Sequence, residues 1–191
     1  INQLKERFLN HVDIAEQNIF TLDGFVAQEA VQDCCRLYEQ RIKTFGGLDI
    51  ALIGIGRSGN IAANEPGSGI QSITRLILIG NTSREEMENS EQTKETLPPC
   101  SLTMGIATLL SAKAIYLTAW GEEKAEIMQK VVENSITDSL PASFLQTHQR
   151  SARPECCLSS YPHRTSLARN FLPVDRQACA LGFGLALPED R

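Results

Sequence analysis

The residues best suited to chemistry lie in a glycine-rich stretch, LIGIGRSGNIAANEPGSG, at residues 52–69. Its glycines allow the backbone to approach a ligand closely and to expose N–H groups toward it. Asn64 and Glu65 follow these glycines, and Pro66 restricts the exit from the turn. A carboxylate at the end of a strand can act as a general acid or base, so Glu65 is a candidate catalytic residue. The alternative interpretation is that Glu65 only caps the turn.

The same stretch contains the spacing G-x-G-x-x-G at Gly54, Gly56 and Gly59. A dinucleotide site needs a strand, this glycine turn, a continuous helix, and an acidic residue about 20 residues further on. Here Pro66 would interrupt the helix, and no acidic residue lies between Glu65 and Glu85. The sequence therefore argues against a nicotinamide or flavin cofactor.

Alternating strand and helix patterns predict where the glycine stretch lies. Short apolar runs at 48–56, 74–80 and 114–120 predict strands, and periodic apolar positions predict helices over 25–45 and 122–134. Buried-type strands that alternate with helices indicate an α/β domain with a mostly parallel sheet. Ligands of such sheets bind beyond the carboxyl ends of the strands, where the glycine stretch and the segment WGEEK both begin.

Charge and composition exclude several classes of protein. The net charge of −5 and the pI near 5.3 give no broad basic surface for nucleic acid, although a single loop can still bind a small anion. No apolar run approaches the roughly 20 residues of a membrane span, and no secretory signal is recognisable. The adjacent pairs Cys34-Cys35 and Cys156-Cys157 fit no C-x-x-C spacing, so we expect reduced thiols, no metal site and a cytoplasmic location.

The end of the chain differs in composition from the rest. All six lysines lie at or before Lys130, whereas residues 150–191 contain six arginines and three cysteines. We therefore divide the chain into a domain at 1–148 and a divergent tail at 149–191. The tail is either a loop-rich ending or the product of a shifted reading frame.

The segment GIGRSGNIAANEPGS resembles the signature of glucosamine-6-phosphate deaminases/isomerases, in which a strand leads into a glycine loop and then F-N-E-P. The likeness continues at 7–24, 101–133 and 141–148, and it covers about residues 4–148. The related 6-phosphogluconolactonases share the fold but lack the N-E-P-G run, so they are less favoured. The resemblance implies a Rossmann-like three-layer sandwich with a mostly parallel sheet.

As the resemblance implies it, the reaction converts glucosamine 6-phosphate to fructose 6-phosphate and ammonia, with no metal or organic cofactor. The ligand would be a phosphorylated amino sugar, and the protein a homo-oligomer that contacts neither nucleic acid nor membrane. The family begins with a further strand and a phosphate loop, followed by a D-E-Y run with the base that acts at C2. We expect this chain to lack that N-terminal strand and that base.

Four positions correspond to functional residues of the family, and only some of them keep the family's residue type. Glu65 matches the glutamate that supports a ring-opening histidine, and Asn60 takes the place of that histidine. An asparagine amide cannot exchange a proton near neutral pH, whereas an imidazole can. Ser58 stands where many members have aspartate, and Lys124 matches the lysine that binds the substrate phosphate. The other candidate substrate-binding residues are Gly56, Arg57, Gly59, Asn64 and, for an arginine after the second strand, Arg84.

Two functions from different classes remain open at this point. One is a sugar-phosphate isomerase/deaminase of amino-sugar metabolism, which rests on Glu65 and Lys124. The other is a catalytically inactive module that binds or senses a sugar phosphate, which rests on Asn60. Both require the Glu65 carboxylate and the Lys124 amine to lie on the same side of the molecule.

Overall fold

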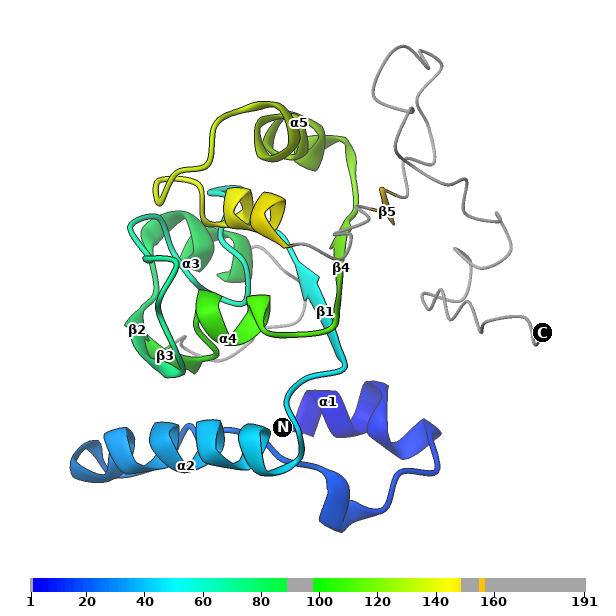
Figure 1. The fold of residues 1–191 in the computed structure, drawn as a ribbon, viewed down its shortest axis with the longest axis vertical. Coiled ribbons are helices and arrows are strands. Elements are labelled where there is room, and N and C mark those ends of the chain that lie inside the picture. Colours follow the sequence, from blue (N-terminus) through cyan, green and yellow to red (C-terminus); the bar gives the residue numbers. More distant parts are fainter. Residues whose placement is uncertain (1, 89–97, 149–154, 157–191) are drawn as a thin grey trace.

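The computed structural model describes residues 2–88, 98–148 and 155–156 (Figure 1). Its α-helices are α1 (Asn2–Arg7), α2 (Val31–Thr44), α3 (Asn81–Glu88), α4 (Ile106–Leu110) and α5 (Ala125–Glu133). Its strands are β1 (Ile50–Gly54), β2 (Arg75–Leu78), β3 (Cys100–Thr103), β4 (Ala114–Ala119) and β5 (Glu155–Cys156). Short 3-10 helices are η1 (Leu9–His11), η2 (Glu16–Asn18), η3 (Gln28–Ala30), η4 (Glu122–Lys124) and η5 (Pro141–Thr147).

Three strands form a parallel sheet in the order β1-β4-β5. In the β1–β4 pair, Ile50 lies opposite Ala114 and Gly54 lies opposite Thr118, so the two strands end at the same edge. The glycine stretch leaves this edge from β1, and the WGEEK segment leaves it from β4. The predicted α/β class with a parallel sheet is therefore confirmed.

The predicted strand at 74–80 does not join this sheet. It forms β2, which pairs antiparallel with β3 in a separate two-stranded ribbon. Parallel strands are normally buried on both faces, whereas Leu76 and Leu78 of β2 are exposed. An apolar run of this length fits either arrangement, so the sequence alone could not separate them.

The helix predicted over 25–45 is shorter in the structure, because α2 begins at Val31 after the turn η3. The helix predicted over 122–134 begins with the 3-10 turn η4 and continues as α5. Most of the tail predicted at 149–191 lies outside the described residues. Its described part is β5, which pairs with β4, and the division of the chain at residue 148 stays a prediction.

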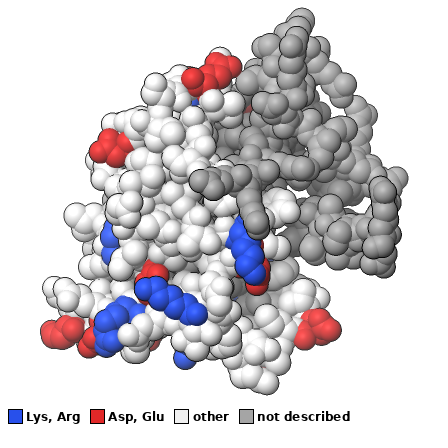
Figure 2. Space-filling view, in the orientation of Figure 1, with Lys and Arg blue, Asp and Glu red and all other residues white. Residues whose placement is uncertain are grey.

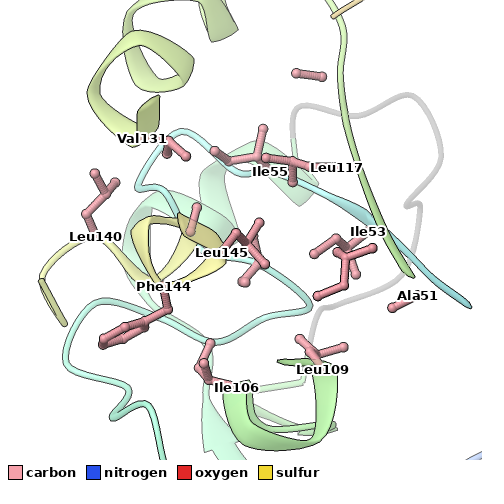
Figure 3. Close-up of a cluster of buried hydrophobic side chains, with 14 of the residues drawn as sticks. Ala51, Ile53, Ile55, Ile106, Leu109, Leu117, Val131, Leu140, Phe144 and Leu145 are labelled. Carbon is pink, nitrogen blue, oxygen red and sulfur yellow. The ribbon is translucent and has the colours of Figure 1, made fainter. Parts of the chain in front are cut away.

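One face of the sheet is packed against helices. Inward-facing side chains of β1 and β4 meet those of α4, α5 and η5 in a single apolar cluster (Figure 3). η5, drawn in yellow in Figure 1, contacts both α4 and α5. Burial of each large aliphatic side chain contributes roughly 1.5–3 kcal/mol, so this cluster is what holds β1 and β4 in place. Its members include Ile53, Ile106, Leu109, Ile115, Leu117, Phe144 and Leu145.

The opposite face of β1 is exposed. Ala51 and Ile53 point into the cluster, whereas Ile50 and Leu52 are 62% and 64% exposed. Tyr116 of the neighbouring strand β4 is also exposed on this face. The sheet therefore has one packed face and one apolar face open to solvent within the described part of the chain.

Helix α2 is tied to the rest of the domain through the buried carboxylate of Glu39. Glu39 Oε1 accepts hydrogen bonds from the Thr74 backbone N–H at 2.8 Å and from the Thr108 hydroxyl at 2.6 Å. The Thr74 hydroxyl donates to the same oxygen at 2.5 Å. Burial raises the pKa of Glu39, but these hydrogen bonds and the charge of Lys43 outweigh it, so the pKa lies below its ordinary value.

This arrangement predicts a pH-dependent contribution to stability. The pKa of Glu39 is lower in the folded state than in the unfolded chain, where the pKa of a glutamate is about 4.3. Its contribution is therefore fully present above that value and is lost as the pH falls through the folded pKa. At pH 7 we expect Glu39→Gln to lower the free energy of unfolding by about 1–3 kcal/mol, and the difference should shrink below about pH 4.

Urea unfolding at neutral and acidic pH measures both quantities. Glu29→Gln, at an exposed position, removes the same charge and is the matched control, with little expected effect at either pH. A Glu39→Gln difference that stays the same from pH 7 to pH 3.5 would contradict the prediction.

Candidate functional site

The glycine stretch folds into a tight loop directly after β1. The Gly56 N–H donates to Asn60 O at 3.0 Å, and the Gly59 N–H donates to Gly56 O at 3.0 Å. Gly59 has φ of +76°, a conformation that a residue with a side chain rarely adopts. A Cβ at Gly56 would lie 1.8 Å from Asn60 Oδ1, so only glycine allows the Asn60 side chain to fold against this backbone.

The side chain of Asn60 is buried and bonded at both ends of its amide. Its Oδ1 accepts from the Ser58 hydroxyl at 3.0 Å, and its Nδ2 donates to the Ser83 hydroxyl of α3 at 3.0 Å. The network fixes the loop against α3. Because an amide has no pKa near neutrality, Asn60 can position a ligand but cannot transfer a proton as a histidine would.

Two alanines with strained backbones connect this loop to Asn64. Ala62 and Ala63 have φ of +46° and +58°, in the left-handed region that costs about 1 kcal/mol or more for a residue with a side chain. The Thr103 hydroxyl donates to Ala62 O. Strain of this kind persists only where the surrounding structure enforces it, and here it turns the chain toward Asn64 and Glu65.

Asn64 is fully buried, and its side chain is bonded within the protein. Nδ2 donates to Ile61 O at 3.0 Å and to Met104 O at 2.8 Å. Oδ1 accepts from Arg75 Nη1 at 2.8 Å. Asn64 therefore connects the end of the glycine stretch to β2 and to the segment before α4, and it positions the residue that follows it.

The carboxylate of Glu65 lies against Gly80, the residue that precedes α3. A Cβ built on Gly80 would be 3.0 Å from Glu65 Oε2, so the absence of a side chain at Gly80 leaves room for the carboxylate. Glu65 Oε1 is buried and has no hydrogen-bond partner among the described residues. A buried carboxylate oxygen that the protein leaves unpaired is available to a ligand or to a proton.

A second carboxylate, that of Glu86, joins Lys124 to Arg57, and sequence reasoning missed it. Glu86 Oε1 contacts the Lys124 ammonium, and Oε2 accepts from the Arg57 backbone N–H at 3.0 Å. Arg57 Nε lies 3.7 Å from Oε1. The side chains of Lys124 and Glu86 are only 15% and 21% exposed, so solvent screens this pair less than a surface ion pair.

The electrostatics keep Glu86 ionised. Burial raises its pKa, but the hydrogen bonds from Lys124 and from the Arg57 backbone, together with both positive charges, outweigh burial and lower it below the ordinary value. At neutral pH the site therefore holds a carboxylate anion between Lys124 and the glycine loop. No motif in the sequence indicated this residue.

One face of α3 brings these groups together. Gly80 directly precedes α3, and Ser83 and Glu86 follow on the helix at three-residue intervals, so each lies next to the one before it on the helix surface. The residues they contact are, in the same order, Glu65, Asn60 and Lys124. With a rise of 1.5 Å per residue, the contacts to Glu65 and to Lys124 are about 9 Å apart along the helix. The two candidate residues thus lie on one side of the molecule.

Arg84 lies on the same helix, one turn after Gly80, and its backbone N–H donates to Gly80 O at 2.9 Å. Its Nη2 donates to Pro98 O at 3.3 Å. A contact between Arg84 and a phosphate stays a prediction.

Charged side chains do not gather into a single patch on the face drawn in Figure 2, where Lys and Arg lie among Asp and Glu. No group of three or more His, Cys, Asp or Glu within residues 2–88, 98–148 and 155–156 could hold a metal ion. In the same part of the chain, no helix is long and apolar enough to cross a membrane.

Comparison with known proteins agrees with this geometry. A sequence model of the glucosamine-6-phosphate isomerases/6-phosphogluconolactonase family matches residues 1–153. The chain belongs to this family. Both β1 with its glycine loop and β4 with Lys124 lie within the matched residues.

Among relatives in the family, a glucosamine-6-phosphate deaminase-like protein of Bacteroides thetaiotaomicron is 53% identical over 171 residues, which is 90% of this chain and 26% of that protein. A glucosamine-6-phosphate deaminase of Oceanobacillus iheyensis is 39% identical over 145 residues, which is 75% of this chain and 57% of that protein. The solved structure of a monomeric glucosamine-6-phosphate deaminase matches with a TM-score of 0.71 and 36% identity, and covers 76% of this chain and 60% of that one. The chain thus spans little more than half the length of the last two deaminases and 26% of the Bacteroides protein.

Proposed function

We propose that this chain is part of a cytoplasmic glucosamine-6-phosphate deaminase, which converts glucosamine 6-phosphate and water to fructose 6-phosphate and ammonia. The observation that carries the proposal is the common face of α3, against which the unpaired carboxylate of Glu65 and the ammonium of Lys124 both lie. Deaminases named for this reaction are among the relatives in the family.

Each side chain has a role that follows from its chemistry. Lys124 would bind the phosphate by a charge-assisted hydrogen bond. The Arg57 backbone N–H, which now donates to Glu86, would face the substrate, whereas the Gly56 and Gly59 N–H groups hold the loop in shape. Arg84 would be a candidate second cation. Ser58 and Asn64 would hold the loop in shape through the hydrogen bonds that they already make.

Glu65 would act at the other end of the sugar, where protons are transferred as the ring opens. A carboxylate with a free buried oxygen can accept and return a proton in such steps. The predicted reaction needs no metal and no organic cofactor, because proton transfer and a fixed phosphate suffice. A homo-oligomer stays a proposal, as does the cytoplasmic location.

A second candidate function is a module that binds the sugar phosphate without turning it over. It is favoured by the two hydrogen bonds of the Asn60 amide, which fill the position of the family's ring-opening histidine with a group that transfers no proton. Phosphate binding by Lys124 is common to both candidates, and the role of Glu65 separates them.

An assay that couples ammonia release to fructose 6-phosphate formation tests the first candidate. We expect Glu65→Gln to lower kcat by about 10²-fold with little change in KM, because proton transfer is lost while binding is kept. Lys124→Gln should raise KM. The matched controls are Glu88→Gln and Lys130→Gln, which remove the same charges at exposed positions, and both should behave like the parent chain.

Thermal unfolding with glucosamine 6-phosphate separates the two candidates when turnover is absent. Stabilisation by the sugar phosphate that Lys124→Gln removes and Lys130→Gln retains would support the binding module. A chain that neither releases ammonia nor gains thermal stability would refute both.

A further inference from the structure

The groups assigned to the substrate phosphate already have an anion between them. The Glu86 carboxylate contacts the Lys124 ammonium through one oxygen and accepts the Arg57 backbone N–H through the other. A phosphate group would use the same kind of donors, an ammonium and a main-chain N–H of a glycine loop. The carboxylate thus imitates two of the oxygens of a bound phosphate.

We propose that Glu86 is an internal competitor for this anion site, so that a phosphomonoester binds at Lys124 only by displacing the Glu86 carboxylate. The inference rests on the proposed role of Lys124 in binding phosphate. The proposal assigns Glu86 of α3 a role in determining which anions the site accepts.

Two anions cannot share these donors. Like charges placed together in a partly buried site repel each other strongly, and here the Lys124 and Glu86 side chains are largely withdrawn from solvent. A doubly charged phosphomonoester interacts more strongly with Lys124 and the nearby Arg57 than a singly charged carboxylate does. The competition therefore excludes weak or singly charged anions and admits a dianion.

The competition also sets the apparent affinity. The apparent dissociation constant of a ligand is inversely proportional to the fraction of sites that are free to bind it. If Glu86 occupies the site nine-tenths of the time, phosphate binding is weakened about tenfold, and removal of the carboxylate restores that factor. The expected effect of a Glu86 substitution is therefore a gain in phosphate affinity, which is unusual for a residue inside a binding site.

Isothermal titration with inorganic phosphate and with glucosamine 6-phosphate tests the proposal on the full chain. We expect Glu86→Gln to tighten the binding of both probes by about tenfold. Glu85→Gln is the matched control, because it removes the same charge from the exposed side of the same helix, and it should change binding by less than about twofold. Unphosphorylated glucosamine should respond to neither substitution.

Two further variants keep the result decisive. Glu86→Ala removes the oxygen acceptors that a glutamine would retain, and the double variant Glu86→Gln/Lys124→Gln should lose the gain. The proposal is overturned if neither Glu86→Gln nor Glu86→Ala binds phosphate more tightly than the parent chain. Because the titration needs no turnover, tighter phosphate binding without ammonia release would support the competitor and refute the deaminase.

Discussion

Replacement of Asn64 by leucine should lower the free energy of unfolding by about 3–5 kcal/mol, because it leaves several buried polar groups without partners. Arg75 Nη1 would lose its 2.8 Å hydrogen bond to Oδ1, and Met104 O would lose its 2.8 Å bond from Nδ2. Leucine has the same branched shape and the same number of side-chain heavy atoms, so it leaves no cavity, and the loss comes from unpaired groups. The strained turn at Ala62 and Ala63 would lose the contacts that enforce it.

Equilibrium unfolding in urea gives the size of this effect. Asn18→Leu makes the same change at an exposed position in η2 and should shift the free energy of unfolding by no more than about 0.5 kcal/mol. If Asn64→Leu were as stable as that control, Asn64 would not be the residue that holds the glycine stretch to β2.

Replacement of Gly105 by alanine should destabilise the protein by about 3 kcal/mol or more. Gly105 has φ of −76°, which any residue can adopt, so backbone conformation is not the reason. The reason is space: a Cβ would lie 2.2 Å from Ser72 O and 2.4 Å from Ile73 O, both of them backbone atoms.

The close approach at Gly105 also positions α4. Ser72 O accepts the Ala107 N–H at 2.8 Å, and Ser72 Oγ accepts the Ile106 N–H at 3.0 Å, so Ser72 caps the start of the helix. A methyl group must separate these two segments and weaken both bonds.

The matched control for Gly105→Ala is Gly54→Ala. A Cβ at Gly54 meets nothing within 4 Å, so this substitution should be neutral or slightly stabilising. Melting temperatures of the two variants, measured together, distinguish the steric effect from a general intolerance of alanine. Equal melting temperatures would show that Ser72 and Gly105 can move apart at little cost.

The local features of the site were predictable from the sequence. β1 and β4 are apolar runs bounded by turn residues, and the glycines between β1 and Glu65 indicate a loop that approaches another group closely. Because the two strands are parallel, their carboxyl ends had to meet at one edge. These inferences depend on local residue patterns and on the general geometry of parallel strands, and they are confirmed.

The parts that could not be predicted depend on long-range contacts. Glu86 contacts Lys124, which lies 38 residues away, and Glu39 contacts Thr108, which lies 69 residues away. Neither glutamate has a distinctive neighbourhood in the sequence. The three-residue spacing of Gly80, Ser83 and Glu86 is visible there, but it has meaning only once α3 is known to run beside the glycine loop. The placement of β2 outside the parallel sheet could not be predicted for the same reason, since its partner β3 follows it after a long interval.

The alternation along β1 has a consequence for handling the protein. In the part of the chain that the structure describes, β1 is an edge strand that is hydrogen-bonded to a neighbour on one side only. Ile50 and Leu52 add a row of exposed apolar side chains on one face of this strand. An edge strand with exposed apolar side chains can pair with strands from other molecules. The rigid strand that carries the glycine loop is therefore also the place where concentrated solutions of this chain would begin to aggregate.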